Sequence, residues 1–210
     1  MRFIVTAGPT REHLDDIRFL TNASSGRMGF AIARTAHDAG HAVTLICGPT
    51  PLPPPDGPRA VPVTSAEEMR DAVLAAFPDT DAVFMTAAVG DYRPEQRVAG
   101  KIKKGEGVRE LRLVRTPDIL AELRRARDRQ VLVGFALEAA DGLANARRKL
   151  EEKGLDLIVL NGPETVGADE SDFTLLFPDG SSDRYMSVTK DFLALCLVSL
   201  VSEGRLTPGR

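Results

Sequence analysis

Apolar runs of strand length alternate with helical patterns along most of this chain, and the alternation constrains the fold more than any other feature. Strands are predicted at residues 3–7, 42–47, 82–86, 131–135 and 157–160. Helices are predicted at residues 29–39, from Ser65 to about residue 77, and at residues 141–153. Strands and helices that alternate at this spacing indicate a parallel sheet with helices on both of its faces.

Start and stop signals mark several of the helix ends. Gly40 and Gly154 follow helical runs and are typical of helix C-termini. Ser65 and Glu68 have the spacing of a capping box. Thr116 is predicted to cap a further helix, with proline in its first turn.

Two segments interrupt the alternation. Residues 88–107 are long, polar and charged, and a loop of that length in a compact domain is usually functional or disordered. Later, FTLLFPDGSSDRYM places two strand-like runs around Pro178, Asp179 and Gly180, which predicts a β-hairpin. A last helix is predicted at residues 190–202, and residues 203–210 are expected to be a frayed tail.

The composition is that of an ordinary soluble globular protein. Of the 210 residues 43% are hydrophobic and 27% charged, which favours one large α/β domain over two small ones. The net charge of -3 gives no sign of a nucleic-acid partner. We expect neither a signal peptide nor a membrane span, and therefore a cytoplasmic location. Cys47 and Cys196 lie in apolar runs without metal-ligand spacing and are predicted to be free thiols.

The loop TNASSGRMG is a candidate anion site. Ligands of an open parallel sheet bind beyond the carboxyl ends of its strands, where this loop is predicted to lie. It brings Ser24, Ser25, Gly26 and Gly29 to the start of a helix. Free backbone N–H groups there favour an anion, above all a phosphate, and glycine allows close approach of the backbone. A capped helix with a tight turn explains the same residues equally well.

A nicotinamide dinucleotide is a poor candidate for this anion. Its fingerprint places G-x-G-x-x-G directly after the first strand, whereas this chain has TAGPT there and its glycines come much later. The second strand ends in Cys47, Gly48 and Pro49 and not in the acid that the fingerprint requires. GKIKKGEG, at residues 100–107, likewise lacks the residue order of a P-loop.

Lysines offer a second set of anion ligands. Lys101, Lys103 and Lys104 lie in the long loop, as either a solvated basic run or part of a closing lid that neutralises phosphate charge. Lys149 and Lys153 are four residues apart on one predicted helix and share a face. That face is either solvent-exposed or part of an anion site.

Six segments, in order, resemble one enzyme family. They are TAGPTREHLDDIRFLTNASSGRMG, TAAVGDYRP, KIKK, TPDIL, VGFALE and KGLDLIVLN, and they span nearly the whole chain. The family is phosphopantothenate–cysteine ligase, often the C-terminal half of a bifunctional bacterial flavoprotein. The resemblance implies a Rossmann-like three-layer α/β sandwich with a mostly parallel sheet and a late β-hairpin insertion. It also implies a single domain over residues 1–210 and a homodimer.

The resemblance implies a ligase reaction in coenzyme A biosynthesis. CTP activates the carboxylate of 4′-phosphopantothenate as an acyl-cytidylate, pyrophosphate leaves, and the amine of L-cysteine gives 4′-phosphopantothenoylcysteine and CMP. Mg²⁺ is expected with the nucleotide. The alternatives are an ATP-dependent version of the same ligase and a non-catalytic nucleotide-binding paralogue.

Site residues follow from the matched positions of the family. The catalytic residues implied are Asn22 and Lys101, and metal ligands are not identified. Substrate phosphate is expected at Ser24, Ser25, Gly26 and Arg27. Nucleotide is expected at Ala87, Asp91, Lys101, Thr116, Pro117, Asp118, Ile119, Phe135, Lys149 and Lys153. The chain departs from the family pattern at Arg27, Gly90, Thr116, Ala139 and Gly162.

The flavin-dependent half of the bifunctional relatives has no counterpart among these motifs. The resemblance therefore implies no bound flavin. Met1, directly before the first strand, favours a free-standing synthetase over an excised domain.

Overall fold

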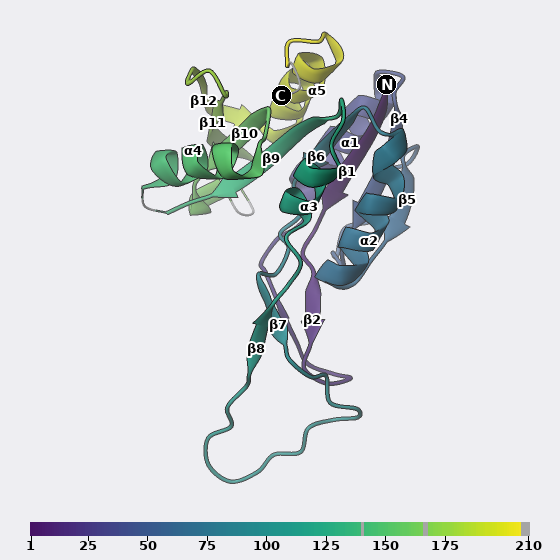
Figure 1. Cartoon of the computed structure of the whole chain (residues 1–210), viewed down its shortest axis with the longest axis vertical. Helices are drawn as coiled ribbons and strands as arrows, with labels where there is room; N and C mark the ends of the chain where they lie inside the picture. The colour runs from purple at the N-terminus through teal and green to yellow at the C-terminus, as the bar shows by residue number, and fades with distance from the viewer. Residues whose placement is uncertain (140, 166–167, 207–210) are drawn as a thin grey trace.

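A mostly parallel sheet of eight strands runs through the body of the molecule, which is described here from a computed structural model covering residues 1–139, 141–165 and 168–206 (Figure 1). The strand order is β12-β11-β10-β9-β6-β1-β4-β5. The parallel strands are β1 (Arg2–Ala7), β4 (Ala42–Cys47), β5 (Arg59–Pro62), β6 (Ala82–Met85), β9 (Val131–Leu137) and β10 (Leu157–Asn161). The predicted hairpin is β11 (Glu170–Leu176) and β12 (Ser182–Thr189), which extends one edge of the sheet in antiparallel fashion.

Helices cover both faces of this sheet, so the predicted three-layer α/β sandwich is confirmed. One apolar core joins the sheet to α1 (Arg27–Asp38) and α5 (Lys190–Ser202). A second core, on the other face, joins it to α2 (Ala66–Ala76), α3 (Ile119–Ala126) and α4 (Gly142–Lys153). Short 3₁₀ turns follow α2 and β10, at η1 (Phe77–Asp79) and η2 (Pro163–Thr165). None of the helices in the described ranges has the length and apolar character needed to cross a membrane.

The helix start predicted at Thr116 is wrong. α3 begins at Ile119, and its N-cap is Asp118, whose carboxylate accepts a hydrogen bond from the Ala121 amide at 3.0 Å. The Thr116 hydroxyl instead donates to the Gly90 carbonyl at 2.6 Å. Threonine and aspartate both cap helices well. Here the Thr116 hydroxyl is engaged by the loop after β6, and Asp118 is the residue that caps α3.

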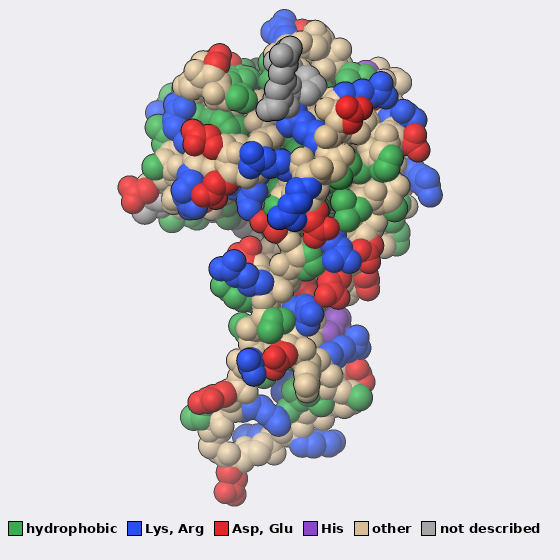
Figure 2. Space-filling view, viewed as in Figure 1, with side chains coloured by type: hydrophobic (Ala, Val, Ile, Leu, Met, Phe, Trp, Pro, Cys, Tyr) green, Lys and Arg blue, Asp and Glu red, His purple; other side chains and the backbone are tan. Residues whose placement is uncertain are grey.

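A long arm projects from the body at the edge where β1 and β6 end, away from the N-terminus and from α5 (Figure 1), and it stands out from the body in the space-filling view (Figure 2). It consists of residues 11–21 and 92–115. The first part is the hairpin of β2 (Arg11–His13) and β3 (Phe19–Thr21), and the second contains β7 (Tyr92–Pro94) paired with β8 (Leu113–Arg115). The long loop predicted as either functional or disordered therefore forms one side of this arm.

The C-terminal segment was expected to fray. The amides of residues 203–205 donate to carbonyls in the last turns of α5, and Leu206 is 6% exposed. Residues 207–210 lie outside the described part of the chain.

α1 approaches β1 so closely that only glycine fits at position 29. A Cβ atom there would lie 2.5 Å from the Thr86 hydroxyl oxygen, 2.6 Å from the Ala7 Cβ and 2.8 Å from the Thr6 carbonyl oxygen. Two of these atoms belong to β1 and cannot move without the strand. The contact fixes the first turn of α1 against the carboxyl end of β1.

Gly29→Ala should lower the free energy of unfolding by about 1–3 kcal/mol, as other overpacked sites do. The higher helix propensity of alanine, worth about 1 kcal/mol, offsets only part of this cost. Urea denaturation measures the change. Gly105→Ala is the control, because a Cβ at position 105 meets no atom within 4 Å. Equal stability of the Gly29 variant and the wild type would contradict the packing argument.

Candidate functional site

A cleft of about 900 Å³ opens at the carboxyl ends of the parallel strands. From β1 the chain adds β4 and β5 on one side of the sheet, and it then adds β6, β9 and β10 on the other side of β1. The cleft lies between β1 and β6, where this strand order changes side. Of the predicted site residues, only Lys101 does not line the cleft. The others do: Asn22, Ser24, Ser25, Gly26, Arg27, Ala87, Asp91, Thr116, Pro117, Asp118, Ile119, Phe135, Lys149 and Lys153.

The N-terminus of α1 forms one wall of the cleft and presents positive charge to it. Gly26 is the N-cap, with a φ of 77°, and itself supplies no side-chain cap. The Ser24 and Ser25 hydroxyls accept from the amides of Gly26 at 3.3 Å and Arg27 at 3.5 Å. Among the described residues, no side chain accepts from the next two amides, those of Met28 and Gly29. That turn also contains no acidic residue. Uncapped amides and the positive end of the helix dipole are suited to a phosphate. Arg27 adds a guanidinium, which pairs with Asp169 at 3.2 Å.

Asn22 is held by the loop that follows β6. Its amide nitrogen donates to the carbonyls of Ala88 at 3.2 Å and Val89 at 3.3 Å. These bonds occupy its donor side and orient the side chain. The atom that Asn22 offers to a ligand is therefore its carbonyl oxygen, an acceptor.

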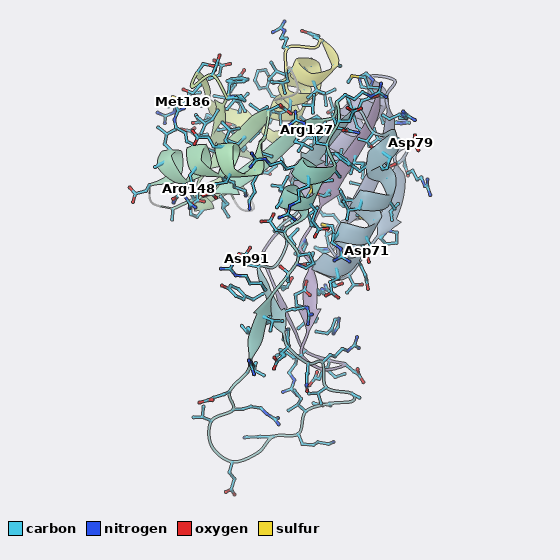
Figure 3. The ribbon with its side chains drawn as sticks, in the orientation of Figure 1. Asp71, Asp79, Asp91, Arg127, Arg148 and Met186 are labelled. Carbon is cyan, nitrogen blue, oxygen red and sulfur yellow. The ribbon has the colours of Figure 1, made fainter. Side chains whose placement is uncertain are left out.

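Asp91 lies where the arm joins the body (Figure 3). Its loop is fixed from two sides. The Gly90 amide donates to the Thr10 hydroxyl at 2.9 Å, and the Thr116 amide donates to the Asp91 carbonyl at 3.0 Å. The Asp91 side chain is exposed, and its carboxylate accepts no hydrogen bond from the described residues.

Lys149 brings a half-buried cation to the opposite wall. Its ammonium donates to the carbonyl of Phe135, near the end of β9, at 2.8 Å. Burial lowers the pKa of this lysine, and the nearby carboxylates of Glu138 and Asp91 offset part of the effect. A cation held in such a place has lost part of its hydration and interacts strongly with an entering anion.

Lys153, one turn further along α4, pairs with Asp118 at the N-cap of α3. Partial burial raises the pKa of Asp118, but the hydrogen bonds from Lys153 and the Ala121 amide outweigh it and hold the pKa below its ordinary value. Asp118 is thus a carboxylate at neutral pH. The two lysines that the sequence places on one helical face do face the cleft.

Lys101 lies on the arm and is exposed. It does not line the cleft of its own chain, and its assignment to the nucleotide stays a prediction. Lys101 comes ten residues after Asp91 in the sequence, but it belongs to the segment between β7 and β8, which projects from the body (Figure 1).

Several residues that line the cleft were not predicted from the sequence. Asn161 ends β10, and its position at a strand end is the one signal that could have singled it out. Lys190 begins α5, half-buried, and its ammonium donates to the Ala168 carbonyl. It reaches the cleft from the antiparallel edge, which no local pattern indicates.

Gly162, one of the departures from the family pattern, lies beside an acid. A Cβ at this position would be 2.2 Å from a carboxylate oxygen of Glu164. The Glu164 carboxylate therefore occupies the space of the absent side chain.

The chain matches one protein family over nearly its full length. Residues 1–204 match the family described as DFP, the DNA/pantothenate metabolism flavoprotein C-terminal domain. The chain belongs to this family, and the resemblance recognised in its sequence motifs is confirmed.

Relatives and a solved structure agree with this assignment. The coenzyme A biosynthesis bifunctional protein CoaBC of Bacillus subtilis (strain 168) is 46% identical over 84% of this chain and 45% of its own length. The CoaBC of Mycobacterium bovis is 40% identical over 95% of this chain and 51% of its own length. The chain thus spans about half the length of these relatives. The crystal structure of a CoaBC C-terminal domain is 38% identical, with a TM-score of 0.84 over 97% of this chain and 95% of that one.

The lowered pKa of Lys149 predicts an alkaline limit to anion binding in the cleft, for which inorganic phosphate is the probe. Only the ammonium form pairs with phosphate. The affinity should therefore fall as the pH rises through the pKa of Lys149, which lies below 10.5, the ordinary pKa of lysine. Lys149→Met should bind phosphate about 10- to 100-fold more weakly, as loss of a hydrogen bond to a charged group implies, and its affinity should lack this decline with pH. Calorimetric titration from about pH 7 to 10 measures both, with Lys103→Met as the control. Wild-type affinity that stays constant to pH 10 would contradict the assignment.

Proposed function

We propose that this chain joins 4′-phosphopantothenate to L-cysteine in coenzyme A biosynthesis, with CTP as the activating nucleotide. A carboxylate oxygen of phosphopantothenate attacks the α-phosphorus of CTP, and pyrophosphate leaves. The cysteine amine then attacks the acyl carbon of the acyl-cytidylate, loses a proton, and releases CMP. The observation that carries the proposal is one cleft, in a chain of the DFP family, lined by anion-binding groups of α1 and α4, two helices that pack on opposite faces of the sheet.

The two walls suit two different phosphates. The first turn of α1, with Ser24, Ser25 and Arg27 beside its free amides, suits the phosphate of phosphopantothenate. Lys149 and Lys153 suit the phosphates of the nucleotide, where negative charge develops as pyrophosphate leaves. The carboxylate to be activated would then lie between the walls.

Mg²⁺ fits this site through the nucleotide more than through the protein. Within the described ranges, no three His, Cys, Asp or Glu residues form a group that could hold a metal ion. Mg²⁺ commonly takes one or two carboxylates and completes its shell with substrate phosphates and water. Asp91 offers an exposed carboxylate at the cleft for this purpose. The ion would neutralise phosphate charge during activation.

Asn22 suits the second half of the reaction. Its free carbonyl oxygen can accept a hydrogen bond from the attacking amine of cysteine, and so hold that amine against the acyl carbon. The side chain is kept in place by the backbone of the loop after β6. Its loss should therefore affect the cysteine step more than the activation step.

We further propose that the working enzyme is a homodimer in which the arm of one copy completes the cleft of the other. The arm exposes large apolar side chains that a second copy would cover: Ile17, Tyr92, Val98, Val108, Leu111 and Leu113. It also carries Lys101, which the cleft of its own chain lacks. A second copy would bring this lysine to the nucleotide phosphates.

Asn22→Ala should still release pyrophosphate from CTP and phosphopantothenate but form product at least about 100-fold more slowly, because the amine loses its positioning group. Mass spectrometry of quenched reactions should show the accumulated acyl-cytidylate. Asn145→Ala is the matched control, since Asn145 lies on α4 and bonds Glu138 outside the cleft. Product formation at the wild-type rate would remove Asn22 from the mechanism.

The choice of nucleotide is tested by pyrophosphate release with phosphopantothenate and Mg²⁺, using CTP and ATP separately, with and without cysteine. Release with CTP, and product only when cysteine is added, is the expected result. Release with ATP but not with CTP would support the same ligase reaction with ATP as its nucleotide. A folded protein that binds nucleotide but releases no pyrophosphate with either would favour the non-catalytic paralogue.

A further inference from the structure

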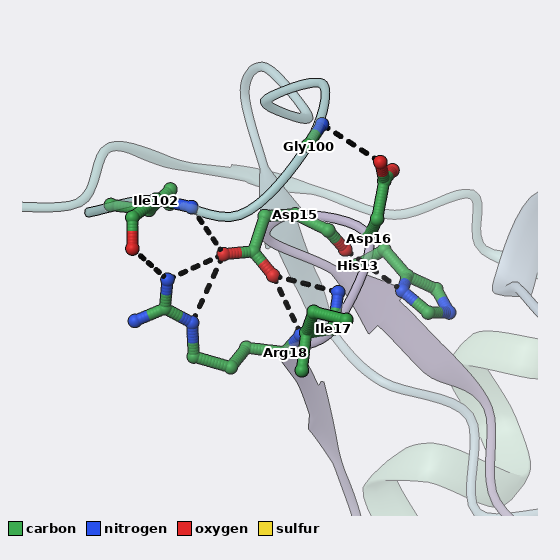
Figure 4. Close-up of polar contacts among 7 residues, drawn as sticks. All are labelled: His13, Asp15, Asp16, Ile17, Arg18, Gly100 and Ile102. Carbon is green, nitrogen blue, oxygen red and sulfur yellow. Dashed lines mark hydrogen bonds and ion pairs between the residues drawn. The ribbon is translucent and has the colours of Figure 1, made fainter.

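Asp15 is a buried carboxylate in the turn between β2 and β3 of the arm (Figure 4). One oxygen accepts hydrogen bonds from the amides of Ile17 at 2.8 Å and Arg18 at 2.7 Å. The other accepts from the Arg18 guanidinium at 2.5 and 3.0 Å, and from the Ile102 amide at 3.0 Å. Arg18 also donates to the Ile102 carbonyl at 2.7 Å. Asp15 and Arg18 together hold both backbone groups of Ile102.

Asp16 holds Gly100 in the same way. Its carboxylate accepts from the Gly100 amide at 2.7 Å, and its own amide donates to the Gly100 carbonyl at 3.2 Å. Arg97 pairs with the second carboxylate oxygen at 3.0 Å. The turn at residues 15–18 therefore fixes the loop on the other side of the arm.

Lys101 is the residue between these two anchors. Four backbone hydrogen bonds, two at Gly100 and two at Ile102, set the direction of the chain on either side of it. Lys103 and Lys104 differ, because residues 103–111 contain no strand or helix and, in the described part of the chain, no backbone hydrogen bond to other segments. The anchoring is specific to one lysine of the KIKK run.

We infer that Asp15 and Asp16 are positioning residues that fix the backbone around Lys101, so that this lysine is presented in one direction for the phosphates of the nucleotide. The inference rests on the proposed function, in which Lys101 acts on the nucleotide. A long flexible side chain on a mobile loop would lose much of its effect, since electrostatic stabilisation depends on groups held in place beforehand.

Both carboxylates remain charged over a wide pH range, as this role requires. The Arg18 hydrogen bonds lower the pKa of Asp15 far below its ordinary value, and burial only partly opposes them. The Gly100 amide and then Arg97 lower the pKa of Asp16. The Arg18 and Arg97 side chains are the cations facing the two groups, each from within the arm.

Amide hydrogen exchange tests the anchoring without any substrate. In the wild type the Gly100 and Ile102 amides should exchange at least about tenfold more slowly than those of residues 103–111, because hydrogen-bonded amides need local opening to exchange. Asp16→Ala should abolish the protection at Gly100. Asp71→Ala, which removes an exposed ion pair on α2, is the control. Equal amide exchange rates across residues 100–111 in the wild type would overturn the inference, even if the variants lose enzymatic activity.

Kinetics test whether the anchoring acts through Lys101. Asp16→Ala should lower kcat/KM for CTP in pyrophosphate release by about 10- to 100-fold, the cost of small displacements of an active group. Asp16→Asn, which keeps an oxygen for the Gly100 amide, should lose less. In a Lys101→Ala background, Asp16→Ala should have no further effect, because the two changes remove one function.

The outcomes separate this inference from the proposed function. Impaired Lys101→Ala with normal Asp16→Ala would overturn the positioning role and leave the ligase proposal intact. Additive effects in the double variant would show that Asp16 supports the arm without acting through Lys101. Normal pyrophosphate release by Lys101→Ala would remove Lys101 from the mechanism, and the positioning role with it.

Discussion

The close contact between α1 and β1 at Gly29 is the constraint on which the rest of the site depends. The absence of a side chain there lets the helix start directly against the end of the central strand. That start brings the uncapped amides of α1 to the point where the strand order reverses. The loop after β6 meets the same point, so Asn22 and Asp91 share one cleft with the helix N-terminus.

The charged groups of the cleft are held by the protein itself. Lys149 is bonded to a strand-end carbonyl, Lys153 to Asp118, and Arg27 to Asp169. Groups fixed in this way need little rearrangement when charge develops on a ligand, which is the usual source of electrostatic catalysis. The arm follows the same rule, because its buried Asp15 fixes a loop that would otherwise be free.

The sequence predicted the body of the fold well. The central parallel strands are continuous apolar runs buried on both faces, and the helices between them bury an apolar face in one of the two cores. It did not predict the arm, because strands of three residues such as β2 and β7 are too short to show a period. The parallel edge strand β5 was also missed, since its pattern is largely exposed and follows a proline-rich loop.

The candidate site, like the fold, was predicted only in part from the sequence. Residues at strand ends and on the motif loops were predicted to meet, and they do line one cleft. Lys190 could not be found in this way, because it comes from the far edge of the sheet. Thr116 was assigned to the wrong role since a threonine before proline has the local pattern of a cap, and only the folded chain shows its bond to Gly90. The place of Lys101 on the arm likewise depends on contacts with residues far away in sequence.

The central claim is that the cleft activates a carboxylate by transfer of the nucleotide's α-phosphoryl group. Phosphopantothenate labelled with ¹⁸O in its carboxylate tests this most directly, with CTP, cysteine and Mg²⁺ present. Attack of the carboxylate on the α-phosphorus predicts that one labelled oxygen appears in the CMP that is released. Label in inorganic phosphate, with CDP as the nucleotide product, would show attack at the γ-phosphorus and would contradict the account.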